Sequence, residues 1–157
     1  MVWWRGLGGL GFIFAVLGGF AGAGIAAALR VDGGVVTAFI GGGIILGGAA
    51  SFALGWYLNV VRPVKQTDEW AAGRQQLLDH QVATGQFRYP TDTPPPASIA
   101  EAQSQAQTLL AWERENAHKA YRNNHSVYSI PLQWFGVVVA VIGLVVVGLG
   151  VAAAFGG

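Results

Sequence analysis

The chain has 157 residues, of which 53% are hydrophobic and only 11% are charged, whereas soluble domains carry roughly one quarter charged residues. Its net charge is +1, and its basic residues are interleaved with acidic ones, which argues against nucleic-acid binding. The absence of cysteine excludes disulfides, iron–sulfur clusters and covalently attached c-type haem. We therefore predict an all-α integral membrane protein.

Three long apolar segments are predicted to cross a bilayer as helices. They cover about residues 7–29, 35–61 and 134–155, and each reaches the roughly 20 apolar residues that a membrane-spanning helix needs. Only the short sequence 30–34 separates the first two, so these two helices must form an antiparallel hairpin. The chain therefore divides into an N-terminal transmembrane hairpin (1–61), a polar segment (62–130) and a C-terminal transmembrane helix (131–157).

Basic residues near the ends of these segments predict the orientation of the chain. The positive-inside rule places the side that is richer in lysine and arginine in the cytoplasm. One side of the membrane would carry Arg5, Arg62, Lys65, Lys119 and Arg122, and the other side only Arg30. We therefore expect the N-terminus and the polar segment in the cytoplasm and the C-terminus outside. The abundance of glycine, alanine and valine is typical of a GC-rich bacterial genome, so we expect the membrane to be a bacterial inner membrane.

Small residues recur at regular steps along all three apolar segments. Such residues allow two helix backbones to approach closely, which is the main source of packing energy inside lipid. The rows predicted as a helix-packing interface are Gly11, Ala15, Gly19 and Ala23; Gly43, Gly47, Ser51 and Gly55; and Gly136, Gly143 and Gly150, with a further row at Gly18, Gly22 and Ala26. Two interpretations remain open. The rows either pack the three helices against each other, or they outnumber the internal contacts, so that one accepts a helix of another subunit.

The apolar segments contain no Asp, Glu, Lys, Arg or His residue. In membrane helices such residues mark proton relays, ion paths and voltage sensors, so an independent pump or ion-coupled transporter is not expected. A haem held by two histidines within the bilayer is excluded as well, because His80, His118 and His125 all belong to the polar segment. At the end of the second segment, Asn59 is a polar group that could bond to a neighbour.

The polar segment is predicted to form two helices on either side of a proline-rich break at 90–96. We expect the first helix to begin after Thr67 as its N-cap and to stop near Gly85. The second helix opens with a capping box, Ser98 to Glu101, and continues to about Asn123. Because their apolar stripes are narrow, the two helices either pack on each other as a cytoplasmic hairpin, dock onto a partner or lie at the bilayer surface. The residues predicted for docking are Trp70, Leu77, Leu78, Leu109 and Leu110.

Patterns typical of catalytic or metal sites are weak in this chain. Glu115 and His118 have the Glu-x-x-His spacing of carboxylate-bridged metal sites, but there is no second copy, so a metal-dependent enzyme is kept only as an alternative. His125 is expected to be an exposed loop residue. There is no Gly-x-Ser-x-Gly turn, and the glycines at 41–43 lie within an apolar segment. We therefore predict no enzyme activity, no cofactor and no metal ion, and the sequence identifies no small-molecule substrate.

The function expected from these observations is that of a non-catalytic accessory or scaffolding subunit of a larger bacterial inner-membrane complex. A respiratory-chain complex or supercomplex is the first expectation, and a lipid or solute transporter is the next. Its partners would be other membrane-protein subunits and the lipid bilayer. The alternative is a homo-oligomeric membrane protein in which identical hairpins pack through the same glycine rows and form a pore or a lipid-organising assembly.

Overall fold

The computed structural model describes residues 4–90 and 93–156, and most of them are helical. The five α-helices are α1 (Leu10–Ala28), α2 (Gly34–Trp56), α3 (Arg62–Ala83), α4 (Ile99–Tyr121) and α5 (Leu132–Phe155). A 3₁₀ helix, η1 (Gly6–Gly9), precedes α1, and a π-helix, η2 (Tyr57–Val61), follows α2. The chain separates into two compact units. The membrane unit comprises residues 1–61 and 123–157, and the hairpin unit comprises residues 62–122.

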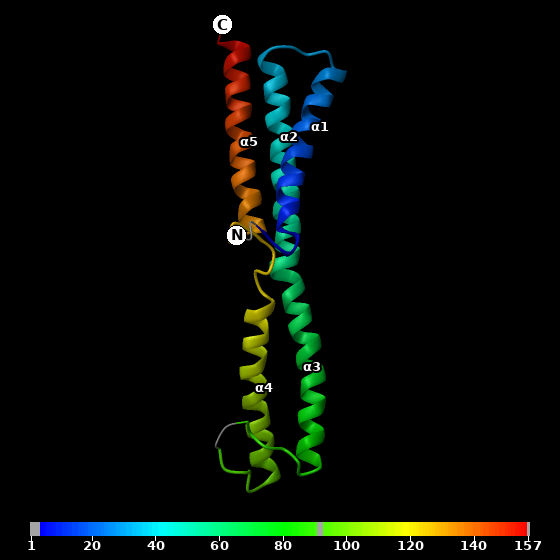
Figure 1. The fold of residues 1–157 in the computed structure, drawn as a ribbon, viewed down its shortest axis with the longest axis vertical. Coiled ribbons are helices and arrows are strands. Elements are labelled where there is room, and N and C mark those ends of the chain that lie inside the picture. Colours follow the sequence, from blue (N-terminus) through cyan, green and yellow to red (C-terminus); the bar gives the residue numbers. More distant parts are fainter. Residues whose placement is uncertain (1–3, 91–92, 157) are drawn as a thin grey trace. The chain divides into compact units, whose positions relative to one another are not determined.

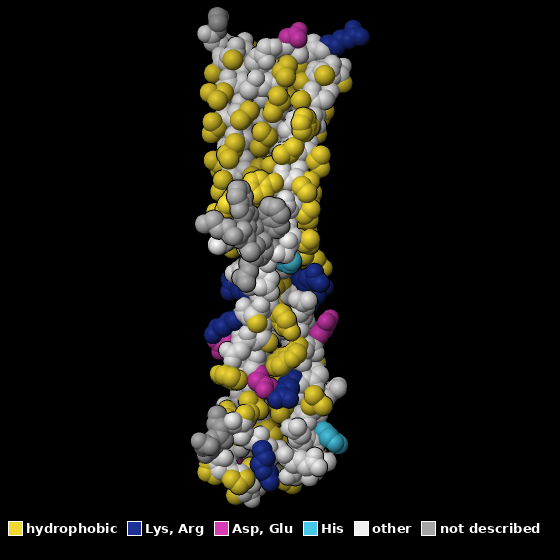
Figure 2. Space-filling view, in the orientation of Figure 1, with side chains coloured by type: hydrophobic (Ala, Val, Ile, Leu, Met, Phe, Trp, Pro, Cys, Tyr) yellow, Lys and Arg dark blue, Asp and Glu magenta, His cyan; other side chains and the backbone are white. Residues whose placement is uncertain are grey.

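Three helical stretches of the described chain are long and apolar enough to cross a membrane: Gly6–Ala28, Gly34–Ala83 and Leu132–Phe155. The first and third match the predicted segments within a few residues, whereas the second continues past the predicted end at residue 61 through η2 and α3. Large apolar side chains point away from the membrane unit: Phe20, Leu46 and Leu149 are 73%, 71% and 63% exposed. Figure 2 shows hydrophobic side chains over the visible face of this unit, with charged ones where α1 turns into α2. Such an outward-facing apolar surface is what a lipid environment requires.

Within the membrane unit, α2 lies between α1 and α5 (Figure 1). It packs extensively against both helices, whereas α1 and α5 contact each other little. The turn between α1 and α2 needs two residues with positive φ, Arg30 at 54° and Gly33 at 63°. The predicted antiparallel hairpin is therefore present, and its second helix is also the one on which α5 packs.

A small antiparallel sheet, which we did not predict, joins the N-terminal segment to the chain before α5. Its strands are β1 (Trp4–Arg5), β2 (Ser126–Val127) and β3 (Ile130–Pro131), in the order β1-β2-β3. Tyr128 and Ser129 form the two-residue turn between β2 and β3, both with positive φ, which suits the twist of a tight hairpin. Strands of two residues are too short to give a detectable sequence period.

The hairpin unit consists of α3 and α4, which pack against each other. Its core contains Leu78 and Val82 of α3, Phe87 of the connection, and Ala102, Ala106 and Leu109 of α4. The predicted helix ends at Gly85 and Ser98 are confirmed. Gly85 has a φ of 69° and donates its N–H to the Val82 carbonyl, and the Ser98 hydroxyl accepts the N–H of Glu101 at 3.2 Å.

The predicted start of the first polar helix at Thr67 is wrong. Helix α3 already begins at Arg62, and Thr67 lies within it, where its hydroxyl donates to the Pro63 carbonyl at 2.7 Å. Proline cannot donate a backbone N–H to the carbonyl four residues earlier, and its ring crowds that carbonyl. The chain accommodates Pro63 by widening into the π-helix η2 immediately before α3, so the helical path is not broken.

Candidate functional site

Two rows of glycines at seven-residue steps face each other along α2 and α5. A Cβ atom added to Gly41 would lie 2.6 Å from the Val147 nitrogen and 2.8 Å from the Gly143 carbonyl oxygen. The backbones of α2 and α5 are therefore so close at Gly41 that a residue with a side chain would not fit there. The row on α5 was predicted, whereas the facing row on α2 was missed except for Gly55, although its seven-residue spacing is visible in the sequence. The facing pairs are Gly34 with Gly150, Gly41 with Gly143, and Gly48 with Gly136.

Gly55 belongs to this α2–α5 seam and not to the row in which we predicted it. A Cβ atom on Gly55 would run into the backbone of Leu132 and Gln133 in α5. Four-residue steps along an α-helix turn by about 40° each, because the helix has 3.6 residues per turn. Three such steps, from Gly43 to Gly55, therefore move the row from the side facing α1 to the side facing α5.

The seam between α1 and α2 uses the further row on α1. Gly18 of α1 and Gly43 of α2 meet backbone to backbone, and Gly22 meets the Phe39 carbonyl. Ser51, which is fully buried, donates from its hydroxyl to the Gly47 carbonyl at 3.0 Å and lies 3.5 Å from the Gly11 carbonyl of α1. Most of the predicted small residues thus hold the three helices together.

The predicted α1 row of Gly11, Ala15, Gly19 and Ala23 is divided between two environments. Gly11 is buried against Leu132 and Phe135 of α5. The other three are half-buried and line an apolar groove of about 450 Å³ on the outside of the membrane unit. We call it the α1–α5 groove; its remaining walls are Val16 and Phe20 of α1, Ile40 and Ile44 of α2, and Val139 and Ile142 of α5.

A buried polar junction lies at the end of the membrane unit that carries η1, η2 and the small sheet. The Asn59 amide accepts from the His125 backbone N–H at 3.0 Å and donates to the His125 carbonyl and to Gln133 Oε1, both at 2.8 Å. The His125 ring accepts the Leu7 backbone N–H on Nδ1 at 3.0 Å. The prediction of an exposed His125 is therefore wrong, because the ring is half-buried and forms part of this junction.

The five residues predicted for docking occupy different positions in the hairpin unit. Leu78 and Leu109 are only 2% and 3% exposed and belong to the core between α3 and α4, so they are not available to a partner. Trp70 and Leu110 are half-buried, whereas Leu77 is 58% exposed. Three further exposed apolar side chains of this unit were not predicted for docking: Val64 of α3, and Ile99 and Trp112 of α4.

A charged cleft of about 580 Å³ lies between the start of α3 and the end of α4, and we call it the hairpin cleft. Arg114 donates to the Asp68 carboxylate across the two helices. Lys119 pairs with Glu115 at 2.7 Å, and this hydrogen bond and the charge of Lys119 lower the pKa of the Glu115 carboxyl. The residues that line the hairpin cleft are Val64, Thr67 and Asp68 of α3 and Ala111, Arg114, Glu115, His118, Lys119 and Arg122 of α4.

A second interhelical ion pair lies further along the hairpin unit. Arg74 of α3 donates through Nε and Nη2 to the two carboxylate oxygens of Glu113 in α4, at 2.7 and 2.8 Å. This hydrogen bonding raises the pKa of Arg74, which remains a cation. Bidentate pairing of this kind fixes the register of two helices more firmly than a single contact.

The Glu115 and His118 side chains both line the hairpin cleft, yet they acquire no set of metal ligands there. Within residues 4–90 and 93–156, no group of three or more His, Asp or Glu side chains is placed to hold a metal ion. Glu115 is engaged by Lys119 and Asp68 by Arg114. The acidic side chains of the cleft thus act as partners of cations.

Comparison with protein-family models, with curated proteins and with solved structures found no match to this chain.

Proposed function

We propose that this chain is a non-catalytic accessory subunit of a larger membrane complex, and that it receives a transmembrane helix of another subunit in the α1–α5 groove. One observation carries the proposal. The groove is apolar, has a volume of about 450 Å³, and is walled on α1 by the small residues Ala15, Gly19 and Ala23. Small residues let a second backbone approach closely, which is how helices gain packing energy in lipid.

The internal seams support this assignment, because they leave Gly19 of that α1 row loosely packed. Gly18, Gly22 and Ala26 pack α1 on α2, and Ala15 also touches this seam, because a Cβ on Gly47 would lie 3.2 Å from the Ala15 Cα. A Cβ on Gly19 would make only ordinary contacts, the nearest at 3.5 Å from Ile44. A loosely packed glycine between two alanines that line the same groove fits a surface reserved for another helix.

The setting we propose is the bacterial inner membrane, with the N-terminus and the hairpin unit in the cytoplasm and the C-terminus outside. The support is the positive-inside rule, applied to Arg62, Lys65, Lys119 and Arg122 against Arg30. A respiratory-chain complex or supercomplex is the first assembly in which to look for the partner, and a lipid or solute transporter is the second.

A mild-detergent pull-down of the tagged full-length chain from its native membrane tests the proposal. We expect partner subunits in a fixed ratio, identified by mass spectrometry, and an absorption spectrum of the eluate reveals haem if the complex is respiratory. Gly19→Leu should abolish co-purification because its side chain fills the groove. Gly148→Leu is the matched control on α5, since nothing lies within 4 Å of a Cβ at that position. Undiminished co-purification with Gly19→Leu would exclude the groove as the docking surface.

Self-association through the same groove is the second candidate function. The four-residue steps from Ala15 to Ala23 are the small-xxx-small spacing by which identical helices pair in membranes. Two copies joined by their α1 helices would form a lipid-organising assembly; a pore is less supported, because the spans carry no charged side chain. Cross-linking in native membranes separates the candidates. A ladder at multiples of 16.4 kDa indicates self-association, and adducts of other masses indicate an accessory subunit.

A further inference from the structure

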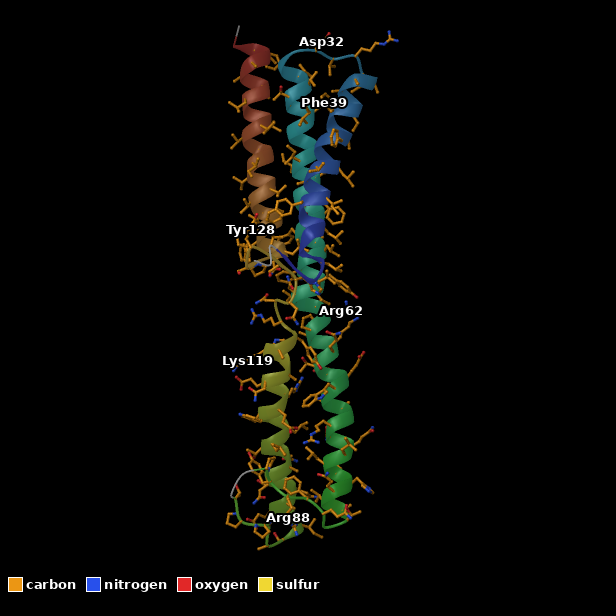
Figure 3. The ribbon with its side chains drawn as sticks, viewed as in Figure 1. Asp32, Phe39, Arg62, Arg88, Lys119 and Tyr128 are labelled. Carbon is orange, nitrogen blue, oxygen red and sulfur yellow. The ribbon has the colours of Figure 1, made fainter. Side chains whose placement is uncertain are left out.

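The hairpin unit carries opposite net charges at its two ends. The end formed by residues 62–69 and 114–122 holds five cations against three carboxylates, a net charge of +2 with histidine neutral. The remainder, residues 70–113, holds two cations against four carboxylates, a net charge of −2. In Figure 3, Arg62 and Lys119 lie at the first end of the hairpin and Arg88 at the other. The hairpin unit as a whole therefore has zero net charge, but the end formed by residues 62–69 and 114–122 is basic.

Part of this positive charge is available to bind an anion. Arg114 and Lys119 are paired with Asp68 and Glu115, and these exposed pairs are held only weakly in water. Arg62, Lys65 and Arg122 are exposed, and none of them forms an ion pair with another residue in the described part of the chain. Arg122 also lines the hairpin cleft, together with Arg114, His118 and Lys119.

Chain connectivity brings Arg62, a residue of the basic end, close to the bilayer surface. Arg62 directly follows Val61, the last residue of η2, at the end of the second apolar segment. Consecutive residues cannot be more than about 3.8 Å apart between Cα atoms, so Arg62 must lie beside the end of that membrane-spanning segment. Anionic headgroups of a bilayer are concentrated at this level, and each basic residue near them contributes favourably to binding.

We propose that the hairpin cleft binds the phosphate group of an anionic phospholipid, with Arg114, Lys119 and Arg122 as the donors. A guanidinium group offers two parallel N–H donors to phosphate oxygens, and an ammonium group offers a compact charge. Val64 and Ala111 supply an apolar part of the cleft against which the glycerol of the lipid fits. Free inorganic phosphate has the same oxygen chemistry. Val64 and Arg122 of the cleft are only a few residues in the chain from the membrane unit, which favours a lipid.

The test uses the full-length protein in nanodiscs that contain equal amounts of phosphatidylglycerol and phosphatidylcholine. After transfer to mild detergent, native mass spectrometry gives the ratio of the two lipids that stay bound. We expect the wild-type chain to retain mainly phosphatidylglycerol. Lys119→Gln/Arg122→Gln should lower the ratio about fivefold for each cation removed, and so by roughly 25-fold in all.

The control variant Arg30→Gln/Arg88→Gln removes the same charge away from the cleft and should leave the ratio unchanged. Lys119→Arg/Arg122→Lys keeps both charges and should retain the enrichment, and circular dichroism verifies that each variant is folded. An equal loss in the control variant would overturn the proposal by indicating a diffuse charge effect. No preference for phosphatidylglycerol in the wild-type chain would also overturn it.

Adding inorganic phosphate in place of chloride at equal ionic strength separates the two sources of phosphate. A lipid site should keep its phosphatidylglycerol in this medium. If inorganic phosphate itself binds and phosphatidylglycerol is not enriched, the cleft is a site for the free anion and the lipid assignment fails. The inference does not depend on the helix-docking function, because every variant in this test lies outside the α1–α5 groove.

Discussion

The side-chain amide of Asn59 pairs with the backbone of His125 at both its oxygen and its nitrogen, in the manner of a neighbouring β-strand. The distances are 3.0 Å from the His125 N–H to Asn59 Oδ1 and 2.8 Å from Asn59 Nδ2 to the His125 carbonyl. Asn59 is fully buried, and it also donates to Gln133 at the start of α5. One side chain thereby joins the end of α2 to the chain that leads into α5.

Replacing Asn59 by Leu should destabilise the membrane unit by about 2–4 kcal/mol, because the partly buried backbone groups of His125 and the buried side chain of Gln133 lose their hydrogen-bond partner. Thermal unfolding in detergent, followed by circular dichroism, measures the loss as a lower Tm. Asn116→Leu serves as the control, since Asn116 is exposed on α4. A Tm for Asn59→Leu that equals the wild-type value would contradict the role of this junction.

Neighbouring glycines of α2 should respond differently to alanine. Gly41→Ala places a Cβ 2.6 Å from the Val147 nitrogen and must separate α2 from α5, whereas a Cβ on Gly42 meets nothing within 4 Å. We expect Gly41→Ala to cost about 1–3 kcal/mol, as overpacking does elsewhere. Denaturation of the purified protein in mixed micelles compares the two variants. Equal stability would mean that α2 and α5 do not pack closely at Gly41.

Two adjacent leucines of α3 should likewise differ. Leu78 is 2% exposed within the hairpin core, and Leu77 is 58% exposed. Leu78→Ala should destabilise the hairpin unit by about 2–5 kcal/mol, while Leu77→Ala should change it by about 0.5 kcal/mol or less. Hydrogen exchange of the α3 and α4 amides reports this unit separately from the spans. Faster exchange in the Leu77 variant than in the Leu78 variant would reverse the assigned faces.

The Glu115 carboxyl should titrate below its ordinary range, because Lys119 bonds to its charged form. A carboxyl whose pKa is lower in the folded than in the unfolded chain stabilises the fold above the unfolded value. That contribution is lost as the pH falls through the folded value. Both side chains are 68% exposed, so the effect on stability is small and the titration itself is the measurement. NMR of the side-chain carboxyl should show the pKa returning to its ordinary value in Lys119→Gln.

Several elements could be predicted because their causes are local. Three apolar segments of sufficient length specify three helices wherever water is absent, since only internal hydrogen bonding satisfies the backbone there. Gly85 tolerates positive φ, and the Ser98 hydroxyl accepts a backbone N–H three residues on, so both mark helix ends regardless of the rest of the chain. The predicted helix start at Thr67 is wrong because the effect of Pro63 on the helix depends on whether the preceding turn can widen.

The packing surfaces could be predicted only in part. The four-residue and seven-residue rows of glycine indicate that helices approach closely, but several rows on one helix compete for the same neighbour. The structure assigns Gly18 and Gly22 to α2 and leaves Ala15, Gly19 and Ala23 along the groove. Nothing in the spacing of these residues distinguishes the two rows.

The sequence by itself determined that this is a helical chain with three membrane-length segments and a polar helical pair, because helix formation and partition into lipid depend on composition and period. Only the tertiary structure decided that Asn59 meets His125, that Gly41 faces Gly143 and that cations from both ends of the polar segment gather at one end of the hairpin. These relationships join residues far apart in the chain. Long-range contacts follow from how whole helices pack, and no local pattern carries that information.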